Sequence, residues 1–416
     1  MEARYLDGPT LTLSSDRSFL WRLCISAWLV RFVIIVAYAL TDAIGILRLS
    51  PDSERYHREG IQIMNLMSYG DFNWPNWLDN GWFQFTGLVY YLITPSSFIM
   101  QLFNITVGTL TIIPLFLMVR QMTNDVRVQR FFAILIAFFP SLVYWSTLML
   151  KDPISILAIA LITYGVFTLR LRMRWSALML LVLGLAILAG TRTYLFVVLT
   201  MVIPAAFLLF PVGRSVIPWR ALAVPVLIGA LPMLIGYGYF ASGAFEKSVF
   251  FDLDYINHVR VKMGDHGGGA IFNEGGVHVW GDSLLSDIWA ALVTVFTIFI
   301  PVNPFAMSGV RQFIALPFVG IMIYLAVPLY SGGLALWRAR RLTIPIIIIT
   351  GAVLVVYVGG TTNAGALFRW TTQIMPYFLI AIALATFQRQ KSILARFANS
   401  AVMLFSQPRY QMLQAY

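Results

Sequence analysis

Long apolar segments separated by short loops constrain this chain more than any other feature of its sequence. A helix needs roughly 20 apolar residues to cross the hydrocarbon core of a bilayer, and a segment in lipid must satisfy its backbone hydrogen bonds internally. Uniformly apolar runs of about this length indicate helices rather than the alternating strands of a membrane barrel. The sequence therefore predicts an all-α, polytopic membrane helix bundle. The runs occupy residues 20–49, 98–118, 131–150, 153–169, 177–190, 195–211, 221–241, 313–336, 343–359 and 374–387.

The basic residues lie between these runs and predict their orientation. The net charge is +11, although charged residues make up only 11% of the chain. An excess of Lys and Arg in short loops marks the cytoplasmic side of a membrane protein, whereas nucleic-acid binding needs a soluble basic face. Membrane topology explains the charge, so no nucleic-acid partner is expected. The basic loops lie at 120–130, 170–174, 214–220, 337–341 and 389–396.

This charge pattern predicts ten spanning helices in a cell (inner) membrane, with both termini in the cytoplasm. The first helix, 19–47, follows Arg17 and emerges on the outer side near Asp52. A cysteine introduced at Ser53 or Gly268 is therefore expected to react with an impermeant reagent from outside, whereas one at Ser176 is not.

One apolar segment does not fit a simple alternation of crossings. If the run 288–301 crossed fully, the basic loop at 337–341 would lie outside, against the charge rule. A re-entrant segment at 288–310 resolves the conflict, because irregular backbone at membrane depth is tolerated against protein or water. Pro301 and Pro304 would break its helix.

The expected organisation is a single integral membrane catalytic domain over residues 1–400, followed by a cytoplasmic tail at 401–416. Two long outer loops, 50–97 and 242–286, interrupt the bundle. The first outer loop contains a short aromatic run at 82–94, which is typical of interfacial helices because Trp and Tyr are enriched at the membrane surface.

Polar side chains concentrate on the outer side, above all in the segment SPDSERYHREG at 50–60. Asp52 follows the first helix at headgroup depth, where burial beneath the outer loops would suit a general base. The same residues are also good turn and helix-start chemistry, because Asp and Ser cap helix N-termini well. The segment alone leaves both interpretations open.

A second acidic residue, Asp152, lies between two apolar runs with almost no loop. Pro153 follows it, so the carboxylate is well placed at a helix N-terminus, where negative charge is favourable. Alternatively, Asp152 orients an acceptor or helps to bind a cation on the outer face.

Two arginines, Arg192 and Arg369, occur among threonines at predicted outer helix ends. A guanidinium there suits a phosphate group, which it can hold with two hydrogen bonds. Lys151 could contribute to the same phosphate site. The alternative is that the arginines extend to the membrane surface and act only as interfacial anchors.

The loop 242–286 carries several Asp, Glu and His residues but no metal-ligand spacing such as HExxH or CxxC. Its density of glycine favours a loop that covers substrate over a metal site. No cofactor is predicted. Within the first helix, Arg31 and Asp42 are costly in lipid and are expected to face the bundle.

The order of these features resembles the GT-C superfamily of polyprenyl-phosphate-dependent glycosyltransferases, especially its family 39-like and ArnT-like bacterial members. Asp52 and Tyr56 match the Asp-x-x-x-Tyr that follows the first helix in that family. LFNITVGTLTIIPLFLMVRQM is similar to the helix after the first outer loop, and FFPSLVYWSTLMLKDPISILAIAL to the next hairpin with its acidic tip. FRWTTQIMPYFLIAIAL is similar to the last helix, with an Arg before a Pro.

The resemblance implies transfer of a sugar from a polyprenyl-phosphate donor to a lipid-linked or glycan acceptor at the outer, periplasmic face. Asp52 would be the catalytic base and Asp152 the second catalytic carboxylate. The other site residues would bind substrate: the phosphate by Arg192, Arg369 and Lys151, and the acceptor side by Glu54, Tyr56 and His57. The chain departs from the family in two respects, since it has Lys-Asp where Glu after a small apolar residue is common, and it lacks a large soluble C-terminal domain.

Two other functions remain open on the sequence. A polysaccharide repeat-unit polymerase or ligase shares lipid-linked substrates and outer arginines, but Arg192 would matter more than Asp52. A lipid-linked-sugar transporter should show internal repeats and broken helices with polar groups at the membrane midplane, and the sequence shows no convincing repeat.

Overall fold

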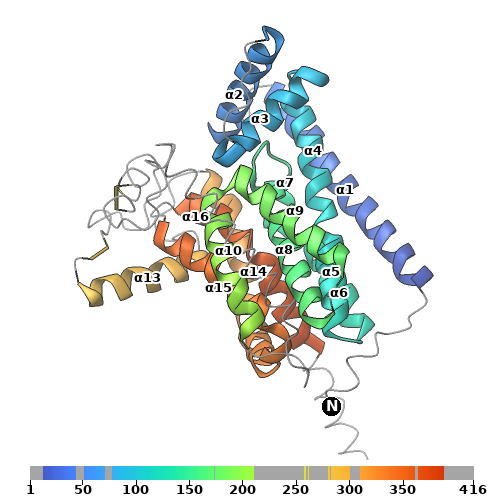
Figure 1. Ribbon diagram of the computed structural model, residues 1–416, viewed down its shortest axis with the longest axis vertical. Helices are drawn as coiled ribbons and strands as arrows, with labels where there is room; N and C mark the ends of the chain where they lie inside the picture. The colour runs from blue at the N-terminus through green and yellow to red at the C-terminus, as the bar shows by residue number, and fades with distance from the viewer. Residues whose placement is uncertain are drawn as a thin grey trace, which may run out of the picture.

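A computed structural model describes residues 13–43, 51–70, 77–172, 174–209, 257–258, 261, 280–281, 283–299, 310–360 and 364–387. Within these ranges the secondary structure consists of helices, as predicted (Figure 1). They are α1 (Leu13–Ala43), α2 (Pro51–Ser68), α3 (Trp77–Leu92), α4 (Ser97–Leu110), α5 (Ile112–Met122), α6 (Val126–Phe138), α7 (Pro140–Ser146), α8 (Asp152–Leu171), α9 (Trp175–Thr191), α10 (Thr193–Leu208), α13 (Leu284–Phe299), α14 (Val310–Arg338), α15 (Arg340–Gly360) and α16 (Ala364–Thr371). A further helix covers Met375–Phe387.

Five of the described helical segments are long and apolar enough to cross a membrane, and the bent pair α6–α7 makes a sixth. The chain is therefore a membrane protein with several spanning helices. The count of ten remains a prediction, because the helix expected at 219–241 lies outside the described residues. In addition, α9, α10 and Met375–Phe387 are apolar but shorter than 18 residues.

The crossing predicted at 131–150 is broken in the middle. Pro140 begins α7, and α6 and α7 meet at an angle of 45°. Proline has no backbone N–H and clashes with the preceding turn, so a helix bends or ends there. The break separates the carbonyl of Ala137, near the end of α6, from the backbone donors of α7.

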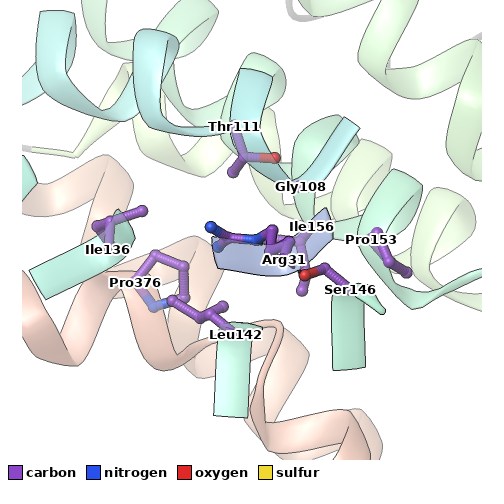
Figure 2. A pocket seen from close by; sticks show the side chains of 9 residues that line it. All are labelled: Arg31, Gly108, Thr111, Ile136, Leu142, Ser146, Pro153, Ile156 and Pro376. Carbon is purple, nitrogen blue, oxygen red and sulfur yellow. Dashed lines mark hydrogen bonds between the residues drawn. The ribbon is translucent and has the colours of Figure 1, made fainter. Parts of the chain in front are cut away.

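Arg31 of α1 fills this break. Its Nη1 donates to the carbonyl oxygens of Ala137 at 2.8 Å and Ala27 at 3.0 Å, and its Nε donates to Ser146 Oγ at 2.9 Å. Figure 2 shows the guanidinium within a small cavity lined by Gly108, Thr111, Ile136, Leu142, Ser146, Pro153, Ile156 and Pro376. The prediction that Arg31 faces the bundle is confirmed, whereas the side chain of Asp42 lies outside the described residues.

Helices α8 and α9 form a closely packed antiparallel pair at the centre of the bundle. A Cβ added at Gly165 or Gly184 would lie 2.8 Å from the Ala177 carbonyl oxygen or 2.6 Å from that of Ala158, so only glycine allows this approach. The pairing places the start of α8 and the end of α9 at the same end of the bundle. Asp152 and Arg192 are therefore brought together by the hairpin.

Helices α2 and α3 pack on each other at that same end of the bundle (Figure 1). Tyr56, Trp82 and Tyr90 form an aromatic core, which rests on Met100 and on the turn 148–150 before α8. The helices of the predicted first outer loop thus pack as a pair on the bundle, and the aromatic run at 82–94 lies largely within α3.

A second group of charges lies at the other end of α1. Asp16 is buried, and its carboxylate lies 3.9 Å from Arg120 and 3.7 Å from Arg130. Arg130 also lies over the ring of Phe19, 5.1 Å from its centroid. These contacts tie the start of α1 to the end of α5 and the start of α6, on the side where the sequence predicts the cytoplasm.

Helix α13 covers the apolar part of the predicted re-entrant segment, but 300–309 lies outside the described residues. The return of this segment to the outer face therefore remains a prediction. The tail 401–416, His266, His278 and nearly all of the loop 242–286 also lie outside the described residues.

The choice of Ser53 as an accessible position is wrong, because Ser53 is buried in α2. Arg58, on the exposed face of the same helix, is a suitable replacement. In a variant without Cys24, a cysteine at Arg58 should react with an impermeant maleimide added to intact cells. A cysteine at the exposed Ser176 should react after the membrane is permeabilised. Labelling of position 176 in intact cells would contradict the predicted orientation.

Candidate active site

Four charged residues that are far apart in the sequence meet at the end of the bundle that carries α2 and α3. Asp52 lies in the first turn of α2, and Asp152 is the first residue of α8. Arg192 occupies the junction between α9 and α10, and Arg369 lies in α16. The sequence predicted a role for each of them, and the fold brings all four into one network.

Asp152 is the centre of this network. Its carboxylate is fully buried, and Oδ1 accepts hydrogen bonds from Arg192 Nη2 at 2.5 Å and from Gln373 Nε2 at 3.0 Å. The other oxygen, Oδ2, lies 3.5 Å from Arg369 Nε. A buried carboxylate is tolerated when it is paired and hydrogen-bonded. These side-chain contacts account for the burial of Asp152 more directly than the helix-start interpretation does.

Asp52 has a different environment. Its Oδ2 accepts a charge-assisted hydrogen bond from Arg369 Nη1, but 46% of its side chain is exposed. Asp52 can therefore reach solvent or a ligand, whereas Asp152 cannot. Two carboxylates that share Arg369 thus differ in access, and this difference assigns them different chemical capacities.

Residues that the sequence analysis did not assign to the site complete the network. Gln373 accepts a hydrogen bond from the Tyr357 hydroxyl at 2.5 Å while it donates to Asp152. The Tyr194 hydroxyl accepts from Arg192 Nη1. A polar signal existed for Gln373, because an amide in an otherwise apolar membrane segment usually faces the bundle and is often functional.

The site contains buried N–H donors without a hydrogen-bond acceptor. They are the Nε atoms of Arg192 and Arg369 and the indole nitrogen of Trp370, and Asp152 Oδ2, 3.5 Å from Arg369 Nε, is a buried acceptor without a hydrogen bond. The Trp370 ring packs at a tilt of 35° against Tyr357, with a centroid distance of 5.1 Å, and its centroid lies 5.8 Å from the Arg192 guanidinium carbon. Unsatisfied buried donors are rare in native proteins, and a missing ligand is one of their explanations. A ligand that offers several acceptor oxygens would satisfy them.

The remaining predicted residues surround this network. Tyr56 is buried one turn after Asp52, and burial raises the pKa of its phenol to about 12 despite the opposing effect of Arg369. Tyr56 is therefore protonated at neutral pH and can donate a hydrogen bond. Lys151 is half-buried beside Asp152, whereas Glu54 is exposed on the outer face of α2.

His57 is engaged within the α2–α3 hairpin. Its Nδ1 lies 2.7 Å from the Tyr90 hydroxyl, which also contacts Met149 Sδ at 3.6 Å. Burial raises the pKa of Tyr90 and lowers that of His57. The structure therefore places His57 in the packing between the hairpin and the turn before α8.

Asn104 of α4 fixes the turn that precedes Asp152. Its side-chain nitrogen donates to the carbonyl oxygens of Leu148 at 2.6 Å and Leu150 at 2.8 Å. These two bonds satisfy backbone groups that no helix serves, and they hold the start of α8 against α4. The sequence analysis noted this asparagine only as part of a family-like motif.

Among the described residues, no three His, Cys, Asp or Glu side chains gather as metal ligands would. Asp52 and Asp152 are bridged by a guanidinium instead. The described network is built from two carboxylates, two guanidinium groups and neutral donors.

No family model, curated protein or solved structure matches the chain. The function is therefore inferred from the geometry of the site.

Asp152→Asn should destabilise the protein, because Arg192 is buried and would lose its anionic partner. Removing one member of a buried ion pair typically costs about 3–5 kcal/mol. Denaturant unfolding of the purified protein in detergent measures the effect. Asp125→Asn is the matched control, because Asp125 caps α6 and Asn caps equally well. Equal stability of the two variants would contradict the central role of Asp152.

Acidification should loosen the α2–α3 hairpin. The pKa of His57 in the folded protein lies below the ordinary value of 6.5, so the unfolded chain binds more protons over that range. The stability that the neutral His57 contributes is fully present above about pH 6.5 and is lost as the pH falls through the pKa of His57 in the folded protein. The protection factors of the amides in 51–68, which correct exchange rates for their intrinsic dependence on pH, should therefore fall between pH 7 and 5. His57→Gln should remove this fall. Protection factors that do not change with pH in the wild type would contradict the role of His57.

Proposed function

We propose that this protein is a membrane glycosyltransferase of the GT-C type. It transfers a sugar from a polyprenyl-phosphate donor to a hydroxyl of a lipid-linked or glycan acceptor. The site lies on the outer, periplasmic side of the cell (inner) membrane, and both termini lie in the cytoplasm. The observation that carries this proposal is the cluster at one end of the bundle, in which Arg369 pairs with the half-exposed Asp52 and Arg192 with the buried Asp152, while the Nε atoms of both arginines lack an acceptor.

The donor phosphate fits the cationic half of the site. A phosphodiester carries one negative charge and two unesterified oxygens, which suit a guanidinium that can donate two parallel hydrogen bonds. Arg369 is the accessible arginine, with 16% of its side chain exposed, whereas Arg192 is 2% exposed. Arg369 therefore contacts the phosphate. The buried Arg192 adds positive electrostatic potential behind it, and Lys151 adds a further positive charge beside Asp152.

Asp52 supplies the base. It takes the proton from the acceptor hydroxyl as the hydroxyl oxygen attacks the anomeric carbon. The bond from that carbon to the phosphate oxygen breaks, and the polyprenyl phosphate leaves with the electron pair. Because a single displacement inverts the anomeric centre, the product has the opposite configuration. Asp152 is unsuited to this proton transfer, since its carboxylate is buried and occupied by Arg192, Arg369 and Gln373.

The α2–α3 hairpin provides the acceptor side of the site. Tyr56 is a protonated donor close to Asp52, and Glu54 and His57 belong to the same helix. In this arrangement, the acceptor approaches along α2 while the donor phosphate lies against α16. Asp152 then has a supporting role, because it holds the two arginines in place.

Asp52→Asn should lower sugar transfer by about 10²–10⁴-fold, the usual contribution of a positioned acid–base group. The assay uses the full chain in proteoliposomes, a panel of radiolabelled undecaprenyl-phosphate sugars and a membrane glycan fraction as acceptor. Arg369→Gln should instead weaken binding of undecaprenyl phosphate by roughly tenfold or more, since a hydrogen bond to a charged group contributes about 1.5–3 kcal/mol.

Glu59→Gln is the matched control, because Glu59 lies on α2 but outside the charge network and pairs with the exposed Arg55. Near-normal transfer by Asp52→Asn would contradict its role as base. Preferential binding of undecaprenyl pyrophosphate would favour a repeat-unit polymerase or ligase instead.

A further inference from the structure

Arg369 contacts both carboxylates of the site, but it holds them in different ways. Its Nη1 donates to Asp52 Oδ2 in a close ion pair. Its Nε lies 3.5 Å from Asp152 Oδ2, too far for a hydrogen bond, and has no other acceptor. The Arg369 guanidinium is therefore attracted by the charge of the buried Asp152 on one side and hydrogen-bonded to the half-exposed Asp52 on the other.

The two carboxylates also differ in how easily they can leave Arg369. Asp152 is fully buried and is fixed by Arg192 and Gln373 as well. Asp52 is nearly half exposed and lies in the first turn of α2, at the edge of the site. An anion that reaches Arg369 from outside would compete with Asp52 and leave Asp152 in place.

This competition matters because Asp52 Oδ2 accepts a hydrogen bond from Arg369 Nη1. The oxygen that faces the cation is therefore engaged and cannot at the same time accept the hydrogen bond of an attacking hydroxyl. Exchange of its carboxylate for a phosphodiester keeps one negative charge on Arg369 and releases Asp52 with its own charge intact.

We propose that Arg369 is a shared cation that holds Asp52 inactive until a lipid-linked phosphodiester takes its place. The inference rests on the proposed function and adds an order to it: the donor binds first, and donor binding frees the base for the acceptor.

The test is equilibrium binding of a radiolabelled undecaprenyl-phosphate sugar, which is a phosphodiester, to the full chain in nanodiscs. Asp52→Asn removes the competing charge, so it should bind the phosphate more tightly than the wild type, by on the order of fivefold for a partly exposed ion pair. In an Arg369→Gln background, the same Asp52→Asn change should have no effect. Asp52→Ser should behave like Asp52→Asn and guards against a local effect of the amide.

The control variant Glu59→Gln removes a negative charge from the same helix and should leave affinity unchanged. Equal or weaker binding by Asp52→Asn would overturn the proposal. So would a tightening that persists in the Arg369→Gln background, because it would reflect the general field of the site. If the wild type itself binds none of the undecaprenyl-phosphate sugars in the panel, the donor assignment of the proposed function fails. Binding without the Asp52 effect rejects only the shared cation.

Discussion

The buried ion pair between Asp152 and Arg192 is the interaction on which the rest of this site depends. A charge removed from water is tolerated only with a partner and with hydrogen bonds to its remaining atoms. Asp152 obtains these from α9–α10, from α16 and from the residues that follow α16. Each of these elements is therefore held at the same end of the bundle, and the glycine contacts between α8 and α9 allow the first of them to approach.

The pairing of Asp152 with Arg192 also gives Asp152 and Asp52 different roles, although their side chains are chemically identical. Asp152 is buried and its Oδ1 is held by Arg192 and Gln373, so it is a fixed anion against which both arginines are positioned. The exposed Asp52 keeps a single guanidinium contact and remains available to a ligand. Environment, rather than residue type, separates a supporting carboxylate from a reactive one.

Much of this arrangement could be predicted from the sequence. Apolar runs predicted the helices, because backbone in lipid must bond within its own segment, and charges between the runs identified Asp52, Asp152, Arg192 and Arg369 as unusual. Their mutual contacts could not be predicted, because pairing between residues 317 positions apart depends on tertiary packing. The bend at Pro140 was missed because the run 131–150 was assigned as one crossing from its apolar character alone, although a proline inside a helix favours a break. Ser53 was misplaced because it lies in a polar segment that nevertheless docks on the bundle.

The bend between α6 and α7 has a consequence for how the chain can vary. Arg31 is acceptable in the bundle because it serves the carbonyl of Ala137, which the bend at Pro140 leaves without a helical partner. Loss of Arg31 alone would orphan that carbonyl, whereas loss of Pro140 alone would let a straighter helix reclaim it and leave a buried cation short of acceptors. Positions 31 and 140 should therefore covary: proteins that descend from this chain should keep both Arg31 and Pro140 or replace both together.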